Sequence, residues 1–307
     1  MGRKSGVIRS VLHGEGRVVL FLLLCVLLAE GGMRIIERRL SKDVDHIRSL
    51  PDVARQMREH TGEKILFIGN SLTRCSIVPE IICEHRRKSG VTDPAVFLFY
   101  PDATNAVNWD YGIRRWFLNA GAVPDQVFIG TGPLHLADRA PGDATRLGAF
   151  YVSSDQIQRI MREDLHDWEQ RCEFVLARLS ILFASRQKVK PRVFGPLIPA
   201  YFDMEQWANL QRNPNARDAA PATDTFRHLD ALLQRLRQSN ISAHVFTIPQ
   251  PKPYDLAPEA KRTIEKNGAH LHHLANIPGI SKAHFKDGYH LDAEGAAIFS
   301  RALAESP

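Results

Sequence analysis

The stretch KILFIGNSLTRC, residues 64–75, joins an apolar run to a Gly-Asn-Ser turn. The run 64–69 has the length and composition of a buried β-strand, and glycine followed by asparagine ends it abruptly. The turn leaves one small hydroxyl, that of Ser71, directly after the strand. A serine in such a place is most often a turn or helix N-cap residue, but it can also contact phosphate or act as a nucleophile.

Apolar runs alternate with helical stretches along the rest of the chain. We expect strands at 64–69, 95–100, 126–130, 192–198 and 241–248, and helices near 78–89, 106–120, 153–187, 223–239 and 292–304. This alternation predicts an α/β fold, with a mostly parallel sheet covered by helices on both faces. Ligands bind at the carboxyl ends of the strands in such sheets, and Ser71 lies at that end of the first strand.

A second polar pattern lies near the other end of the chain, in FKDGYHLDAEG, residues 285–295. Asp287 and His290 are three residues apart, just before a helix that we expect to begin near residue 292. Taken alone, these are ordinary turn and helix-start residues. Together with Ser71 they form a nucleophile, a base and an orienting carboxylate, since an imidazole titrates near neutral pH and can accept a hydroxyl proton.

This combination resembles the SGNH (GDSL-like) hydrolase superfamily. The matching segments are FIGNSLT at 67–73, GAVPDQVFIGTG at 121–132 and DGYHLDAEG at 287–295, and the resemblance extends over about residues 62–305. It implies a flavodoxin-like, three-layer α/β/α fold, with Ser71 as nucleophile, His290 as base and Asp287 as its partner. It requires neither a metal nor an organic cofactor.

The chain departs from the family pattern at the oxyanion hole. The family's third block offers Gly-x-Asn-Asp, whereas GTGPLHL at 130–136 has no asparagine, and YPDATNAVNWDYG at 100–112 lacks the early glycine of the second block. Candidate donors are therefore the Ser71 N–H, a backbone N–H within 103–105, the Asn105 side chain and His135. Loss of one donor typically lowers a rate about a hundred- to a thousandfold. The departure is compatible with weak hydrolysis, a rearranged hole or an inactive enzyme.

The N-terminal region carries most of the charge excess. Residues 1–60 hold 11 Lys and Arg against 7 Asp and Glu, and the remaining 247 residues hold 29 against 27. A nearly neutral body argues against broad nucleic-acid binding, which needs a concentrated basic face.

The composition of this N-terminal region fits a membrane segment better than a nucleic-acid-binding one. The uncharged run 18–29 would span about 18 Å as a helix, less than the roughly 30 Å of a hydrocarbon core, but extension through Ile36 reaches spanning length. Glu30 and Arg34 would then lie near the interface. We favour an uncleaved anchor over a signal cleaved near residues 29–31, and a buried soluble helix comes third. Basic residues both precede and follow the run: Arg3, Lys4, Arg9, Arg17, Arg34, Arg38 and Arg39.

Other residue groups predict packing rather than chemistry. The four cysteines show neither a disulfide framework nor metal-type spacing. The histidines of AHLHHL, residues 269–274, would alternate between the two faces of a strand, so a metal site is not expected. Aromatic residues within 109–117 have helical spacing, which is typical of a core more than of a sugar-binding groove.

The sequence therefore predicts a membrane anchor over 1–36, a helical stalk over 37–60 and an SGNH-like catalytic domain over 61–307. The resemblance to membrane-anchored cell-envelope members, which include DltD-like proteins and polysaccharide O-acetylation auxiliaries, implies a serine acyl esterase or O-acyltransferase outside the cytoplasm. Its expected partners are the membrane, an acylated carbohydrate or other envelope polymer, and a membrane-bound O-acyltransferase. The alternative is a catalytically degenerate protein that binds such a polymer or acyltransferase.

Overall fold

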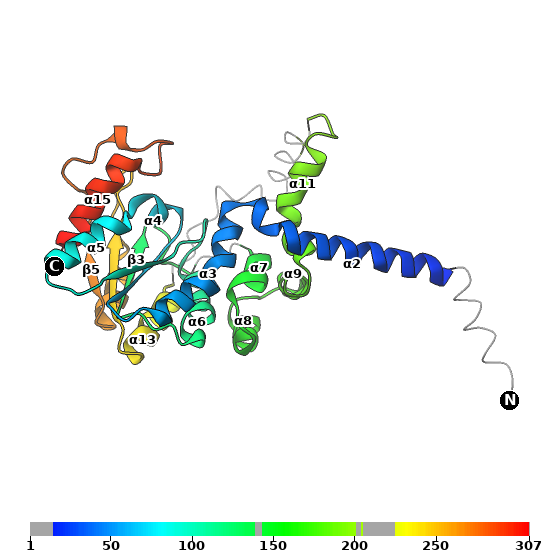
Figure 1. Cartoon of the computed structure of the whole chain (residues 1–307), viewed down its shortest axis with the longest axis horizontal. Helices are drawn as coiled ribbons and strands as arrows, with labels where there is room; N and C mark the ends of the chain where they lie inside the picture. Colours follow the sequence, from blue (N-terminus) through cyan, green and yellow to red (C-terminus); the bar gives the residue numbers. More distant parts are fainter. Residues whose placement is uncertain (1–14, 139–142, 201–203, 205–224, 307) are drawn as a thin grey trace.

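A five-stranded parallel sheet forms the centre of the molecule (Figure 1). The computed structural model describes residues 15–138, 143–200, 204 and 225–306. The strands follow the order β2-β1-β3-β4-β5, which is the flavodoxin-like order. The predicted α/β fold with a mostly parallel sheet is confirmed. The strands are β1 (Lys64–Ile68), β2 (Ala95–Phe99), β3 (Gln126–Thr131), β4 (Ser242–Thr247) and β5 (His270–His272).

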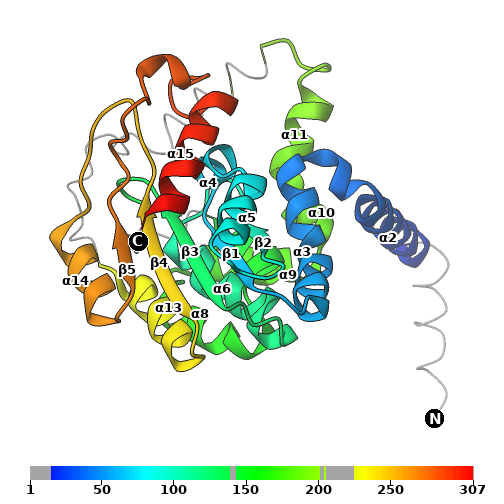
Figure 2. The same ribbon diagram turned by 60° about the vertical axis from the view of Figure 1, so that its left-hand side comes forward.

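Helices cover both faces of the sheet because successive strand residues point to opposite sides. Ile65 and Phe67 of β1 face α5 and α15, whereas Leu66 and Ile68 join a larger core with α3, α6 and α13. Figure 2 shows α15 and α5 side by side on the first of these faces. The helices around the sheet are α3 (Lys42–Glu59), α4 (Ser71–Ser76), α5 (Pro79–Lys88), α6 (Ala106–Trp116), α13 (Arg227–Gln238), α14 (Pro258–Lys266) and α15 (Ala293–Glu305).

The region between β3 and α13 is a set of short helices rather than one long one. They are α7 (Ala144–Arg146), α8 (Ile157–Glu163), α9 (Trp168–Leu179), α10 (Ile181–Ala184) and α11 (Arg186–Phe194), with the one-turn segments η2 (Leu147–Tyr151) and η3 (Ser154–Gln156) among them. Two further one-turn segments, η1 (Leu118–Ala120) and η4 (Lys282–His284), lie outside this region. Asp167 and Ser180 cap α9 and α10 by accepting backbone N–H groups, which divides the helical stretch that we expected at 153–187.

One predicted strand is wrong. Residues 192–198 do not join the sheet; they lie at the end of α11 and in the turn after it. Pro191 and Pro196 have no N–H for a strand ladder, and the segment is largely exposed, so its apolar residues do not enter the core. The fifth strand is His270–His272, within the histidine-rich stretch.

The N-terminal helix α2 (Glu15–Leu40) extends away from the rest of the molecule (Figure 1). Its part from Gly16 to Leu40 is long and apolar enough to cross a membrane, and almost all of it is exposed. A signal sequence would have the same features. The first basic residues of this segment, Arg3, Lys4 and Arg9, lie outside the described residues.

The stretch that we expected to be a stalk, 37–60, contains α3, and α3 packs onto the sheet. Its inward side is buried over its whole length, through Val44, Ile47, Leu50, Ala54 and Met57. These residues recur at helical spacing and belong to the larger of the two core clusters. This helix therefore contributes to the core of the domain.

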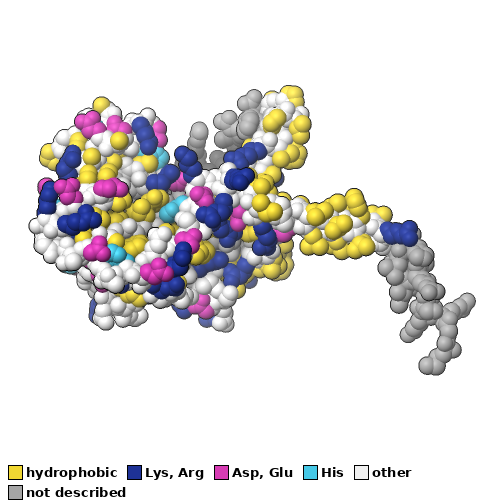
Figure 3. Space-filling view, in the orientation of Figure 1, with side chains coloured by type: hydrophobic (Ala, Val, Ile, Leu, Met, Phe, Trp, Pro, Cys, Tyr) yellow, Lys and Arg dark blue, Asp and Glu magenta, His cyan; other side chains and the backbone are white. Residues whose placement is uncertain are grey.

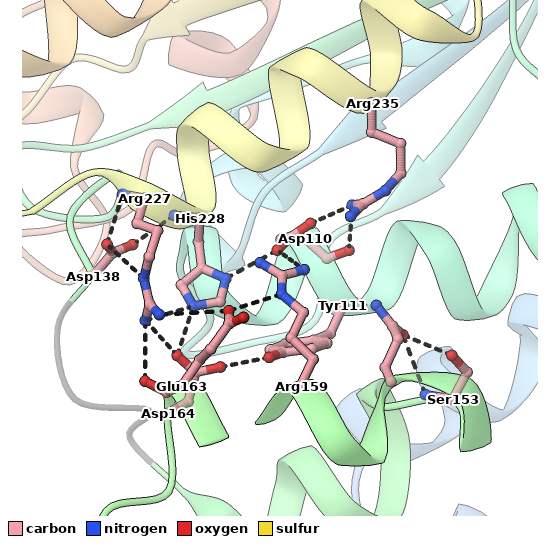
Figure 4. A network of polar contacts seen from close by, with 11 residues as sticks. Asp110, Tyr111, Asp138, Ser153, Arg159, Glu163, Asp164, Arg227, His228 and Arg235 are labelled. Carbon is pink, nitrogen blue, oxygen red and sulfur yellow. Dashed lines mark hydrogen bonds and ion pairs between the residues drawn. The ribbon is translucent and has the colours of Figure 1, made fainter. Parts of the chain in front are cut away.

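A buried charged network joins α6, α8 and α13 (Figure 4). The imidazole of His228, which is fully buried, lies between two carboxylates, with Nδ1 2.9 Å from Asp110 Oδ2 and Nε2 2.8 Å from Asp164 Oδ1. Burial alone would lower the pKa of His228, but the hydrogen bonds to the two carboxylates outweigh burial and raise it to about 9. His228 is therefore a cation that donates from both ring nitrogens, and Arg159 and Arg235 supply further positive charge to Asp110.

Replacement of His228 by glutamine is expected to destabilise the fold. Because two buried carboxylates then lose their shared cation, the free energy of unfolding should fall by about 3–5 kcal/mol near neutral pH. The pKa of His228 is raised from 6.5 to about 9 on folding, so its stabilisation is complete below the lower value and is lost as the pH rises through the upper one. Thermal unfolding followed by circular dichroism should show a decline in melting temperature toward alkaline pH that is steeper in the wild type than in His228→Gln.

The exposed His166 provides the matched control. His166→Gln should keep both the melting temperature and the alkaline decline of the wild type. Equal pH profiles for the wild type and His228→Gln would contradict the assignment of a charged imidazole at this position.

Candidate active site

Ser71 lies at the carboxyl end of β1, where a tight turn leads into α4. The side chain of Asn70 accepts the N–H of Leu72 at 3.0 Å and so caps the helix that begins at Ser71. Gly69 is required by packing, since a Cβ atom there would lie 1.8 Å from the Thr73 hydroxyl. Thr73 in turn fits beside Gly130 at the end of β3, where a Cβ would also overlap its hydroxyl. The sequence Gly-Asn-Ser-Leu-Thr thus holds Ser71 at the edge of the sheet.

The loop after β2 is fastened to this turn. Asn70 Nδ2 donates to the Thr104 carbonyl at 3.0 Å, and the Thr104 hydroxyl lies within hydrogen-bond distance of the Gly69 carbonyl, at 3.2 Å. Arg74 of α4 also pairs with Asp102 at 2.8 Å. Asn70 is part of the motif FIGNSLT, but its contact with Thr104 spans 34 residues and could not be predicted from that motif.

Asp287 and His290 lie in a short loop before α15. An antiparallel bridge between Phe285 and Leu291 closes the loop, and Gly288 adopts a positive φ of 75° inside it. The Asp287 carboxylate accepts the backbone N–H groups of Tyr289 at 3.0 Å and His290 at 2.7 Å. These contacts fix the carboxylate beside the imidazole that follows it by three residues.

The structure brings the three predicted residues together. His290 Nε2 is 2.9 Å from Ser71 Oγ, and His290 Nδ1 is 2.7 Å from Asp287 Oδ2. A carboxylate only accepts, so Nδ1 carries the proton and donates to Asp287. This leaves the lone pair of Nε2 facing the serine hydroxyl, which is the tautomer needed to remove its proton.

The local hydrogen bonds keep Asp287 ionised. The backbone N–H of His290, followed by its imidazole, holds the pKa of the Asp287 carboxyl well below its usual range. The Asp287 side chain is 49% exposed and the His290 side chain is 21% exposed, so the site lies at the molecular surface. Tyr289 packs edge-on against the His290 ring and borders the site on one side.

Asn105, one of the oxyanion donors predicted from the sequence, is the N-cap of α6. Its side-chain oxygen accepts the N–H of Val107 at 3.1 Å, and its own N–H donates to the Asn108 side chain at 3.2 Å. Only its Nδ2 group is therefore placed to donate elsewhere. Ala103, two residues earlier, has a positive φ of 52°, a conformation that usually needs glycine. This chain thus places alanine in a glycine-type backbone conformation in the loop between β2 and α6.

His135 lies where a side chain at position 132 would point. A Cβ on Gly132 would be 3.0 Å from the His135 ring and 3.0 Å from Leu72, the neighbour of Ser71. His135 Nδ1 accepts the N–H of Gly132 at 3.1 Å, which leaves the proton of a neutral imidazole on Nε2. The imidazole therefore occupies the space next to the turn that an asparagine at position 132 would enter.

The remaining sequence candidates lie in the core or apart from the site. Trp109 and Tyr111 are fully buried, as expected of core residues. Among the described residues, no group of three or more His, Cys, Asp or Glu side chains could hold a metal ion. His244 and His272 form a hydrogen-bonded pair at 3.0 Å on one face of the sheet.

The comparisons with known proteins give only distant likenesses. No family model matches the chain, and no curated protein matches it. Among solved structures, it resembles TesA (11% identity, 78% of this chain and 96% of that chain, TM-score 0.38), the acetyl xylan esterase Axe2 from Geobacillus stearothermophilus (13%, 79% and 93%, 0.39) and the acetyl xylan esterase AlAXEase (12%, 79% and 96%, 0.35). Likenesses this weak do not identify an activity, so the function has to be argued from the residues of this chain.

Replacement of Gly69 by alanine is expected to displace Ser71. The new methyl group would overlap the Thr73 side chain, so α4 must move or the fold must loosen. We expect a lower melting temperature and at least a tenfold slower reaction of Ser71 with a fluorophosphonate, since a misplacement of about 1 Å can cost a hundredfold in rate. Gly31→Ala, with nothing within 4 Å of the new methyl, is the control. Unchanged serine reactivity in Gly69→Ala would contradict this packing argument.

Proposed function

We propose that this chain is a membrane-anchored serine acyl esterase or O-acyltransferase. The observation that carries the proposal is the continuous contact from Ser71 Oγ to His290 Nε2 at 2.9 Å, and from His290 Nδ1 to Asp287 Oδ2 at 2.7 Å. A surface serine with a base in contact, and a base with an orienting carboxylate in contact, has the arrangement of an activated nucleophile.

The proposed reaction proceeds through an acyl-serine. Ser71 Oγ attacks the acyl carbonyl carbon while its proton passes to His290 Nε2. The protonated imidazole then gives that proton to the leaving alkoxide as the ester C–O bond breaks. In the second half, His290 removes a proton from water or from an acceptor hydroxyl, whose oxygen attacks the acyl-serine. The acyl–Oγ bond then breaks, the acid or the new ester leaves, and His290 returns the proton to Ser71 Oγ. Asp287 stays ionised throughout and stabilises the imidazolium.

Water as the second nucleophile makes the chain an esterase, and a sugar hydroxyl makes it a transferase. The site lies at the surface, with half of the Asp287 side chain exposed, which suits a polymer substrate that cannot enter a deep pocket. The apolar helix α2 supports a position at a membrane. We therefore propose an acylated envelope carbohydrate or related polymer as substrate, on the extracytoplasmic side.

Three oxyanion donors are proposed for this chain. They are the Ser71 N–H, a backbone N–H of the 103–105 loop and the Nδ2 group of Asn105. Within the 103–105 loop, the N–H of residue 105 already donates to the Asn108 side chain. The backbone donor to the oxyanion is therefore proposed to be the N–H of residue 103 or 104. The hydrogen bonds between Asn70, Gly69 and Thr104 hold this loop against the serine turn.

A non-catalytic role in binding a polymer or a membrane-bound acyltransferase is the second candidate. Gly132 favours it, because this position has no side chain to donate to an oxyanion. The intact contacts among Ser71, His290 and Asp287 favour catalysis. A serine-directed probe separates the two functions.

The test compares fluorophosphonate labelling and p-nitrophenyl acetate hydrolysis by the full-length protein in detergent. Ser71→Ala should abolish labelling, and His290→Ala should lower the hydrolysis rate by about a thousandfold or more. Asp287→Asn should lower it by about a hundred- to ten-thousandfold, because an amide no longer selects the required tautomer. Ser76→Ala, at a serine buried in the same helix, is the matched control and should retain labelling. Folded wild-type protein that neither labels nor hydrolyses the ester would exclude the catalytic proposal and leave the binding role.

A further inference from the structure

The helix α2 is bonded to the domain within its apolar part. The Glu30 carboxylate accepts the N–H groups of Ile181 at 2.9 Å and Leu182 at 3.0 Å, and the Ser180 hydroxyl lies 2.8 Å from it. Glu30 thus caps α10 from outside, and Arg34 balances its charge at 2.9 Å. Ten residues after Glu30, at the end of α2, the Leu40 carbonyl accepts a hydrogen bond from Arg192 of α11 at 2.6 Å. α2 is therefore attached to α10 and α11 at two levels.

These contacts determine the depth of α10 in any membrane that α2 crosses. From Val18 to Glu30 the helix rises about 18 Å, whereas a hydrocarbon core is roughly 30 Å thick. A membrane that begins at Val18 therefore ends beyond Glu30, near Ile36. The start of α10 then lies at the level of the bilayer or its headgroups, together with the end of α9 to which α10 is joined.

The elements that α2 contacts, and the end of α9 joined to them, carry exposed apolar side chains. On α9, Leu176 is 46% exposed and Leu179 is 70% exposed. On α11 and the turn after it, Val193 is 45% exposed and Leu197 is 71% exposed. Figures 1 and 2 both place α11 at the end of the molecule where α2 joins it, and α10 contacts α2 and α9. In Figure 3, apolar side chains cover α2 and the outward side of the α11 region.

The orientation of α11 fits a lipid surface. In Figure 1, α11 runs across the direction of α2, so it lies along the membrane plane when α2 crosses that plane. Its sequence RQKVKPRVF combines four basic residues with valine and phenylalanine. Three of the four basic side chains bond to the protein itself: Arg186 pairs with Glu173, Lys188 with Asp43, and Arg192 donates to the Leu40 carbonyl. The exposed apolar side chains are therefore what α11 and the turn after it offer to a lipid surface.

We propose that these exposed apolar residues of α9, α11 and the turn after α11, termed the lipid face, insert into the headgroup boundary of the membrane that α2 crosses. The lipid face comprises Val175, Leu176, Leu179, Val193, Leu197 and Ile198. The domain then rests on the bilayer in a fixed orientation and meets its substrate at that surface. The inference rests on the membrane anchoring in the proposed function, and it is independent of the chemistry of Ser71.

The test measures the depth of single cysteines in vesicles. The four native cysteines are replaced by serine, and one cysteine is restored or introduced in the full-length chain: Cys25 in α2, Leu179→Cys, Leu197→Cys or Val123→Cys. Each protein is labelled with an environment-sensitive fluorophore and reconstituted into phosphatidylcholine and phosphatidylglycerol vesicles, with and without doxyl-labelled lipid. Val123 is the matched control, because it is an exposed apolar residue. It lies close to the end of α3 farthest from α2, where Arg58 binds the Ala120 carbonyl.

We expect doxyl lipid to quench the probes at positions 179 and 197 at least half as strongly as the probe at Cys25, and to leave the probe at 123 unquenched. Quenching at Cys25 with none at 179 and 197 would overturn the lipid face while leaving the anchor in place, and a dimer in the same samples would then identify a second copy as its occupant. No quenching at Cys25 would overturn both the anchor and the lipid face. Fluorophosphonate labelling of the same proteins reports separately on the proposed chemistry, and equal melting temperatures show that each variant is folded.

Discussion

The contact between Ser71 and His290 joins residues that are 219 positions apart, and the site depends on it. The parallel sheet makes the contact feasible, because the carboxyl ends of its strands meet at one edge. Helix α15 makes it specific. The Ser300 side chain of α15 accepts the N–H of Val78 and donates to the Ser76 carbonyl, so α15 is bonded to the end of α4. The loop that carries His290 is therefore held over the helix that begins with Ser71.

The sequence predicted the sheet where local and tertiary preferences agree. The strand at 64–69 is apolar throughout and ends in a glycine turn, and it forms β1 within one residue of its predicted end. The stretch 192–198 has similar apolar content but follows and contains prolines, and its side chains face outward. Composition does not reveal whether an apolar run enters a core or faces another apolar phase. β5, with only three residues and two histidines, is too short and too polar to stand out.

The three residues Ser71, Asp287 and His290 were predictable as a group because their chemistry restricts their spacing and position. The surrounding contacts were less predictable, since they depend on backbone conformations that no local motif encodes. The positive φ at Ala103 contradicts the usual preference for glycine. The placement of His135 against Gly132 depends on a contact with another element, since the Ala106 N–H at the start of α6 donates to the His135 carbonyl. Such contacts follow from the fold and cannot be read from spacing.

Helix α2 and the site belong to one bonded unit. Asp43, at the start of α3 just after α2, accepts the N–H of Asp102 at 2.7 Å and pairs with Arg146 at 2.9 Å. Asp102 in turn pairs with Arg74, three residues after Ser71. The loop that supplies the proposed oxyanion donors is thus fixed on one side by the serine turn and on the other by the first helix after the apolar segment. Because α3 is part of the core and Glu30 binds α10 directly, a tilt of α2 would be transmitted to the whole domain. In the proposed function, this rigidity presents Ser71 at a fixed angle to the membrane that α2 is proposed to cross, which suits the proposed reaction on a polymer attached to that membrane.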